Sequence, residues 1–128
     1  MLVQLLIDKY ARKRAASVCF VDPTTFREAS HSKKILFVAH VWSVKSQTAL
    51  VQLLHSLDNA PDPIPAVLVI NADLELPPEV VKFQDLLVHG NGLVVMFNNG
   101  KFRAARSGGN LPEFTSTVNS FLAEATSQ

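Results

Sequence analysis

The sequence predicts a single α/β domain in which helices flank a mixed β-sheet. Two apolar segments, residues 35–42 and 66–71, have the near-continuous hydrophobicity of strands buried on both faces. Each is followed by a helical pattern, and the connections have the length of crossovers in a parallel sheet. Asn98-Asn99-Gly100 separates two further β-prone segments and is a strong hairpin signal, so we expect the sheet to end antiparallel.

The size and charge of the chain restrict the classes of function. Its 128 residues, 48% of them apolar, suffice for one core and leave no room for a second catalytic domain. A net charge of +1 gives no electrostatic argument for binding nucleic acid or a membrane surface. The longest uninterrupted apolar run, residues 35–39, is far shorter than the roughly 20 residues of a membrane-spanning helix, so no span is expected. The single cysteine, Cys19, cannot form an internal disulfide, which favours an intracellular protein.

Residues 1–17 are interpreted as a basic amphipathic extension that precedes a domain of residues 18–128. Two interpretations of the extension remain open. It has the basic, acid-poor composition of a mitochondrial presequence. Alternatively, it is an extra helix that packs Leu2, Leu5 and Leu6 on the domain, an interpretation that Asp8 favours.

The elements of the first half follow from local patterns. Residues 18–21 form a short β-prone run, and Asp22-Pro23 has the N-cap and first-turn proline of a short helix. The strand at 35–42 leads into a helix with one apolar stripe at i, i+3, i+4 and i+7 spacing. The stripe consists of Leu50, Leu53, Leu54 and Leu57. Three prolines within five residues then make 60–65 an extended connector before the next strand.

The second half continues in the same way. Pro77-Pro78 opens a helix, and strands at 93–97 and 101–106 form the hairpin. Asn110 with Glu113 has the spacing of a capping box for a last helix. The expected apolar faces of the two helices are Val80, Phe83 and Leu87, and Phe114, Val118, Phe121 and Leu122. The predicted order is β-α-β-α-β-α-β-β-α, preceded by the N-terminal helix.

The segment Trp42-Ser43-Val44-Lys45-Ser46 lies between an apolar strand and an amphipathic helix. Thioredoxins carry Trp-Cys-Gly-Pro-Cys at that junction. The element order, the Asn98-Asn99-Gly100-Lys101 hairpin and the Gly108-Gly109 pair before the last helix extend the likeness, so the chain resembles the thioredoxins from about residue 18 to 125. This resemblance implies the thioredoxin fold.

The resemblance also locates four features that carry redox chemistry in that family, and all four are changed. The nucleophilic and resolving cysteines correspond to Ser43 and Ser46, whose hydroxyls neither ionise near neutral pH nor form mixed disulfides. The buried proton-accepting acid corresponds to Phe37, the lysine that tunes it to Val69, and the cis-proline to Gly92. Such a joint loss argues against a deliberate cysteine-to-serine substitution and implies a fold without thiol–disulfide catalysis.

Other candidate sites have simpler structural explanations. Ser43 begins a helix without an accompanying base or a G-x-S-x-G elbow, so a capping role for Ser43 or Ser46 is favoured over a hydrolase nucleophile. Gly108-Gly109-Asn110 is interpreted as a turn and cap, because no phosphate-loop lysine accompanies it. No metal or other cofactor is expected, since four scattered histidines and one cysteine lack metal-site spacing. The histidines are His31, His40, His55 and His89.

The leading functional hypothesis is a non-catalytic protein-interaction module that serves as a structural or adaptor subunit of a larger assembly. Its expected docking surface is the former substrate groove or, alternatively, another face of the domain. The groove comprises Trp42, Ser43, Asn91, Gly92 and Leu93. An exposed Trp42 would be a contact anchor, whereas a Trp42 packed on its own domain would be structural, and both interpretations stay open.

Three narrower alternatives remain. Ala39-His40-Val41-Trp42 and Glu75-Leu76-Pro77 resemble segments of the spliceosomal thioredoxin-like proteins of the Dim type, which would place the protein in the nucleus instead of the cytoplasm or mitochondrial matrix. A divergent thiol oxidoreductase would use Cys19, which a mid-strand position predicts to be buried and inert. Nucleic acid would be contacted only weakly or indirectly. That contact would use Arg12, Lys13 and Arg14.

Overall fold

The computed structural model describes residues 2–11, 17–20, 33–61, 64–73, 76–87 and 89–124, with the backbone alone for Leu2 and Glu79. The elements in chain order are α1 (Leu2–Tyr10), β1 (Val18–Phe20), β2 (Lys33–Ala39), α3 (Val44–Asp58), β3 (Ala66–Asn71), α4 (Pro78–Val81), the 3-10 helix η2 (Gln84–Leu87), β4 (Leu93–Asn98), β5 (Lys101–Ser107) and α5 (Leu111–Ala123). The helix expected after Asp22-Pro23 and the basic cluster at residues 12–14 lie outside the described residues.

The sheet is mixed, as predicted. Its strands lie in the order β1-β3-β2-β4-β5. Strands β1, β3 and β2 pair in parallel, and β4 pairs antiparallel with both β2 and β5. The hairpin turn uses the conformation that its sequence indicates, because Asn99 and Gly100 both have positive φ, 53° and 78°. Phe37 occupies the middle of the central strand, where it pairs with Val69 of β3 and Val94 of β4.

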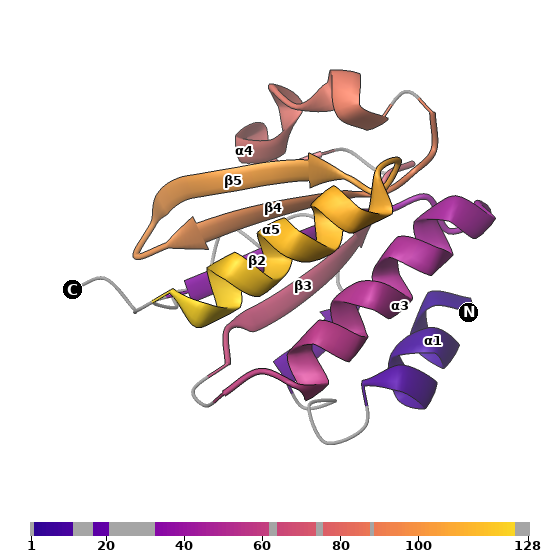
Figure 1. Cartoon of the computed structure of the whole chain (residues 1–128). Coiled ribbons are helices and arrows are strands. Elements are labelled where there is room, and N and C mark those ends of the chain that lie inside the picture. Colours follow the sequence, from indigo (N-terminus) through magenta and orange to yellow (C-terminus); the bar gives the residue numbers. More distant parts are fainter. Residues whose placement is uncertain are drawn as a thin grey trace.

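Helices cover the two faces of the sheet unequally. Helices α3 and α5 lie side by side on one face, with α1 beside α3, and α4 with η2 lies on the other face (Figure 1). The predicted apolar stripes of α3 and α5 are buried as expected. Phe37 packs edge-on against Phe114 of α5, with ring centroids 6.3 Å apart. This α3–α5 face holds the larger of the two hydrophobic clusters and supports the candidate site.

Helix α1 joins this larger cluster through a different face from the one predicted. Val3, Ile7 and Ala11 are buried, Leu6 packs partly against the cluster, and Leu5 is 63% exposed. Spacing at i, i+4 and i+8 gives a narrow stripe. This stripe, together with Leu6, packs toward α3, whereas Leu5 is directed away from the cluster. The expectation for Leu5 was therefore wrong.

Two element boundaries also differ from the predictions. Strand β2 ends at Ala39 because the chain turns there, with the Ser43 N–H donating to the His40 carbonyl at 2.9 Å. The helix predicted from Pro78 stops after one turn and resumes as η2, since Val80 and Val81 are β-branched and weaken the helix. Phe83 and Leu87 still pack, as expected, on the smaller hydrophobic cluster, which contains Val80 and is called here the α4-side cluster. None of the described helices is long and apolar enough to cross a membrane.

Candidate functional site

The turn between β2 and α3 is held by Ser43 and Ser46. Ser43 is the N-cap of α3, and its Oγ accepts the N–H of Ser46 at 3.4 Å. The Ser46 Oγ accepts the N–H of His40 at 2.9 Å and is buried. Gln47 closes the turn by donating its side-chain amide to the Val41 carbonyl. The serines therefore act as hydrogen-bonding parts of the turn, as their capping role predicted.

Below this turn, an aromatic ring fills the interior. A Cβ placed on Gly92 would lie 2.8 Å from Phe37 Cζ and 3.0 Å from Ser46 Oγ. Gly92 therefore packs against both the Phe37 ring and the Ser46 hydroxyl. Gly92 has φ of 79°, a conformation that favours glycine. Phe37 and Ser46 are both buried beneath the turn, and neither side chain is ionisable near neutral pH.

Trp42 lies on the surface above this packed interior. Its indole is 67% exposed, and its Cη2 atom approaches Gly90 so closely that a Cβ there would lie 3.2 Å away. The His40 ring packs edge-on against it, with centroids 5.7 Å apart. Val44, in the first turn of α3, is 74% exposed beside it in sequence. Trp42 is thus exposed on one side and supported on the other, and Val44 is a second exposed apolar residue two positions along the chain.

The loop of residues 89–92 is hydrogen-bonded to the segment just before α5. Gly108 donates its N–H to the Gly92 carbonyl at 3.1 Å, and a Cβ on Gly108 would lie 2.3 Å from the Asn91 carbonyl oxygen. Asn110 caps α5 by accepting the Glu113 N–H, as the capping-box spacing predicted. Asn91 and Leu93 are buried, so they offer no exposed surface in this arrangement.

Three buried polar atoms of the described residues around the turn lack a hydrogen-bond partner. They are His40 Nδ1, His40 Nε2 and Asn91 Oδ1. A buried polar group without a partner costs on the order of 1–3 kcal/mol. Within the described ranges, no group of three or more His, Cys, Asp or Glu is placed to hold a metal ion.

Comparison with known proteins places this geometry in a known architecture. Neither a protein-family model nor a curated protein matches the chain. The crystal structure of thioredoxin from Trypanosoma brucei brucei matches 83% of this chain and 93% of its own, with a TM-score of 0.57 and 15% identity. The crystal structure of Trxlp from Edwardsiella tarda EIB202 matches 84% of this chain and 99% of its own, with a TM-score of 0.53 and 19% identity.

The chain has a thioredoxin fold. The predicted fold class is therefore confirmed, and the chain contains one cysteine, so the paired cysteines of a thioredoxin are absent. The Dim-type resemblance stays a prediction. Of its two segments, Ala39 to Trp42 forms the turn described above, whereas Glu75 lies outside the described residues.

The single cysteine of this thioredoxin fold is placed differently from the prediction. Cys19 is exposed, not buried. It lies in edge strand β1, next to Val18, which packs into the larger hydrophobic cluster on the α3–α5 face. Because side chains alternate along a strand, Cys19 points to the opposite face. Helix α3 and both serines are on the other side of the sheet from it. The mid-strand position predicted burial because both neighbours are apolar, but an edge strand is covered on fewer sides.

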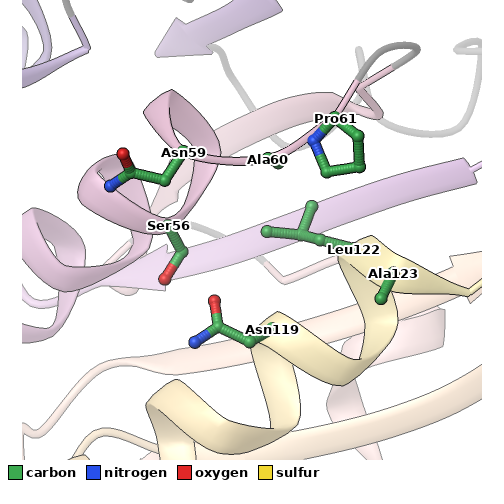
Figure 2. A pocket seen from close by; sticks show the side chains of 7 residues that line it. All are labelled: Ser56, Asn59, Ala60, Pro61, Asn119, Leu122 and Ala123. Atoms are coloured by element: carbon green, nitrogen blue, oxygen red, sulfur yellow. The ribbon is translucent and has the colours of Figure 1, made fainter.

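A shallow cavity opens at the far end of α3, away from Trp42. It has a volume of about 320 Å³ and lies between the ends of α3 and α5 (Figure 2). Figure 2 shows the side chains of Ser56 and Asn119 pointing toward one another across it, with Leu122 at its base. Its lining contains no ionisable side chain. The cavity therefore offers hydrogen bonds but no acid, base or nucleophile pair.

A buried charge at the same end of the sheet was not anticipated. Lys33 is 6% exposed, and its Nζ donates to the carbonyls of Glu124 at 2.6 Å and Leu122 at 3.4 Å. Burial lowers the pKa of Lys33, while the Glu124 carboxylate acts in the opposite direction. In the sequence, Lys33-Lys34 resembles an ordinary solvated strand start, so no local signal identifies this cap at the C-terminus of α5.

Glu124 gives a pH-dependent prediction. A hydrogen bond from Asn98 and the nearby Arg103 guanidinium hold its pKa below the usual value. A carboxyl with a lowered folded pKa adds stability above its unfolded pKa of about 4.3, and this is lost as pH falls through the folded value. We expect Glu124→Gln to lower the free energy of unfolding by about 1 kcal/mol or less at pH 7 and not at about pH 2. Urea unfolding at both pH values measures this, and an equal loss at both would contradict the assignment.

Proposed function

We propose that the chain is a non-catalytic protein-interaction module that docks through Trp42 and Val44, a surface called here the Trp42 rim. The observation that carries the proposal is the 67% exposure of Trp42, which lies above an interior where Phe37 packs against Gly92. A soluble domain gains nothing in its own core from an aromatic ring held outward. A partner surface that covered the ring would gain the apolar area that water now contacts.

The packing beneath the rim supports a role without thiol chemistry. Both hydroxyls that replace thiols are engaged, with Ser43 Oγ accepting the Ser46 N–H and Ser46 Oγ accepting the His40 N–H. Phe37 stands where proton transfer would need an acid, and it contacts the site through its ring edge. A hydroxyl without a base is a poor nucleophile. The rim is therefore a surface for non-covalent contact.

The Trp42 side chain is also conformationally restricted, as a binding anchor needs to be. The indole is held from below by Gly90 and from the side by His40, so little side-chain freedom is lost when a partner covers it. Tryptophan is enriched among the few residues that dominate binding energy at interfaces. Helix α1 adds a further apolar side chain at Leu5, which lies on a separate element and serves as a control.

Truncation of the anchor tests this proposal. We expect Trp42→Ala to weaken partner binding by about 2 kcal/mol or more, or roughly 30-fold, with little change in thermal stability because the indole is mostly outside the core. The matched control is Leu5→Ala, which removes a similarly exposed apolar side chain on α1. The measurement is purification of the tagged full chain from its native cells, followed by quantitative mass spectrometry of what accompanies it.

The outcomes of that purification are distinct. A stoichiometric partner retained by Leu5→Ala and lost by Trp42→Ala would support the proposal, and its identity would separate a splicing particle from another assembly. A protein that purifies alone, or a partner that Trp42→Ala retains in full, would contradict docking at the rim.

The exposure of Cys19 favours one alternative, a divergent thiol oxidoreductase. Exposure gives the thiol access to a soluble disulfide or peroxide. Its position is unlike that of a redox cysteine, since it lies within a strand and not at the start of a helix. A single thiol would also need a second one from a substrate or cofactor to complete an exchange cycle.

A further inference from the structure

The outer strand β5 has features of a second docking surface, away from the Trp42 rim. Among the described strands it lies at the end of the sheet and pairs with β4 alone. Only its last residue, Ser107, lies near the rim, where it pairs with Leu93. Its first residue, Lys101, lies at the distant hairpin. Outward-facing N–H and C=O groups of such an edge can pair with another extended chain.

The two faces of β5 carry different chemistry. Arg103 forms an ion pair with Glu124, the C-cap residue of α5. The Arg106 Nε lies 3.0 Å from a carboxylate oxygen of Glu113 in that helix without the alignment of a hydrogen bond, and the Arg106 Nη1 donates to the Ala105 carbonyl at 2.8 Å. Lys101 pairs with Asn98, whose side chain also bonds Glu124, so it shares this face. All three charged side chains of β5 are thus cations on the α5 side.

The opposite face of β5 is apolar. Phe102 pairs with Phe97, and Ala105 belongs to the same α4-side cluster. The Phe102 ring is 43% exposed and stacks on Phe83 with centroids 5.1 Å apart and planes 23° from parallel. The Nζ of Lys82 lies over both rings, 5.3 Å from the Phe83 centroid and 5.4 Å from that of Phe102. An aromatic surface with a cation at its border therefore lies directly beside the strand edge.

The pattern of charges selects the kind of chain that can pair here. Cross-strand neighbours of like charge are destabilising, so two β5 edges facing each other would place cations against cations. An incoming strand with acidic side chains on the α5 side would complement Lys101, which has no ion pair with any described acid. Because side chains alternate along a strand, its other side chains would meet Phe102 and Ala105.

We propose that β5 is the docking edge for an extended segment of another protein in which acidic and apolar residues alternate. The added strand would gain main-chain hydrogen bonds along Lys101–Ser107, except at the Ala105 carbonyl, which already accepts the Arg106 guanidinium at 2.8 Å. Its acidic side chains would lie toward Lys101 and its apolar side chains over Phe102. Arg103 is the extra residue of an irregularity opposite Met96 and Phe97. A bulge of this kind fixes the register of pairing and disfavours a long flat contact.

The test uses an acetylated, amidated eight-residue peptide that alternates glutamate and valine, titrated into the isotope-labelled full chain. Two control peptides carry lysine in place of glutamate, or proline at the fourth position to remove a main-chain donor. We expect the glutamate peptide to shift the amide resonances of residues 101–107 and to bind at least tenfold more tightly than either control. Shifts confined to residues 40–46, equal binding of the lysine peptide, or no shift at 1 mM peptide would overturn the proposal.

Protein variants locate the contact independently. Lys101→Glu, at an exposed turn-proximal position, is expected to weaken the glutamate peptide at least fivefold, and Phe102→Ser at least tenfold. Trp42→Ala is expected to leave the affinity unchanged, so the result separates this edge from the Trp42 rim. Unchanged affinity in Lys101→Glu would contradict the proposal even if Phe102→Ser failed to fold. A concentration-dependent dimer, seen by sedimentation and abolished by Phe102→Ser, would assign the edge to a second copy and also overturn it.

Discussion

Gly108→Ala is expected to lower the free energy of unfolding by about 3 kcal/mol or more, which is roughly 10 °C in Tm for a domain of this size. The new Cβ would lie 2.3 Å from the Asn91 carbonyl oxygen and 2.6 Å from the Ala49 Cβ. One of these is main chain and the other is a short, fixed side chain, so neither can rotate away. The hydrogen bond from Gly108 to the Gly92 carbonyl would be strained at the same time. The loop below Trp42 would therefore separate from α5.

Gly100→Ala is the matched control for this substitution. Gly100 has φ of 78° and no atom within 4 Å of the added Cβ, so it is expected to lose about 1 kcal/mol from backbone strain alone. Chemical denaturation of the three proteins measures the difference. Gly108→Ala that is no less stable than Gly100→Ala would mean that the contact between residue 108 and Asn91 is not as close as described.

Gly92→Ala is expected to cost about 2–4 kcal/mol, combining backbone strain with overpacking. Its φ of 79° resembles that of Gly100, but its Cβ would meet Phe37 Cζ at 2.8 Å and Ser46 Oγ at 3.0 Å. The excess over Gly100→Ala therefore isolates the steric contribution at the site. This excess is the energetic measure of how tightly Phe37 has closed the interior below the serines.

A double-mutant cycle identifies the side chain responsible. Phe37→Leu removes the Cζ atom that the new Cβ meets. Gly92→Ala should therefore lower the free energy of unfolding by at least about 1 kcal/mol less in the Phe37→Leu background than in wild type. Equilibrium urea unfolding of the four proteins gives the coupling energy. Strict additivity would show that Phe37 does not fill the space beside Gly92, and would remove the argument that the site is closed.

The fold was predictable from local patterns because its strongest elements are strongly periodic. The leucine stripe of α3, the two apolar central strands and the Asn-Gly hairpin turn each predicted the element observed. The interrupted helix after Pro78 was not predicted, since apolar spacing does not distinguish α-helical from 3-10 turns over ten residues. The buried face of α1 was also missed, because Leu5 and Val3 are equally apolar and tertiary packing alone chooses between them.

The candidate site was predictable in its composition but not in its surface. Ser43 and Ser46, at positions where the resemblance to thioredoxins predicts cysteines, were visible in the sequence, and their contacts follow from the turn. The burial of Leu93 and the exposure of Val44 depend on tertiary packing, which no local pattern specifies. The exposure of Cys19 is of the same kind, because it depends on what covers an edge strand.

The most direct test of the central claim, that the fold serves without redox catalysis, is insulin-disulfide reduction by the purified chain beside its Cys19→Ser variant. We expect both proteins to leave the rate at that of the reductant alone, since the engaged hydroxyls of Ser43 and Ser46 cannot exchange with a disulfide. A catalysed rate in the wild-type chain that disappears in Cys19→Ser would contradict the claim and would assign the protein a thiol-dependent activity at β1.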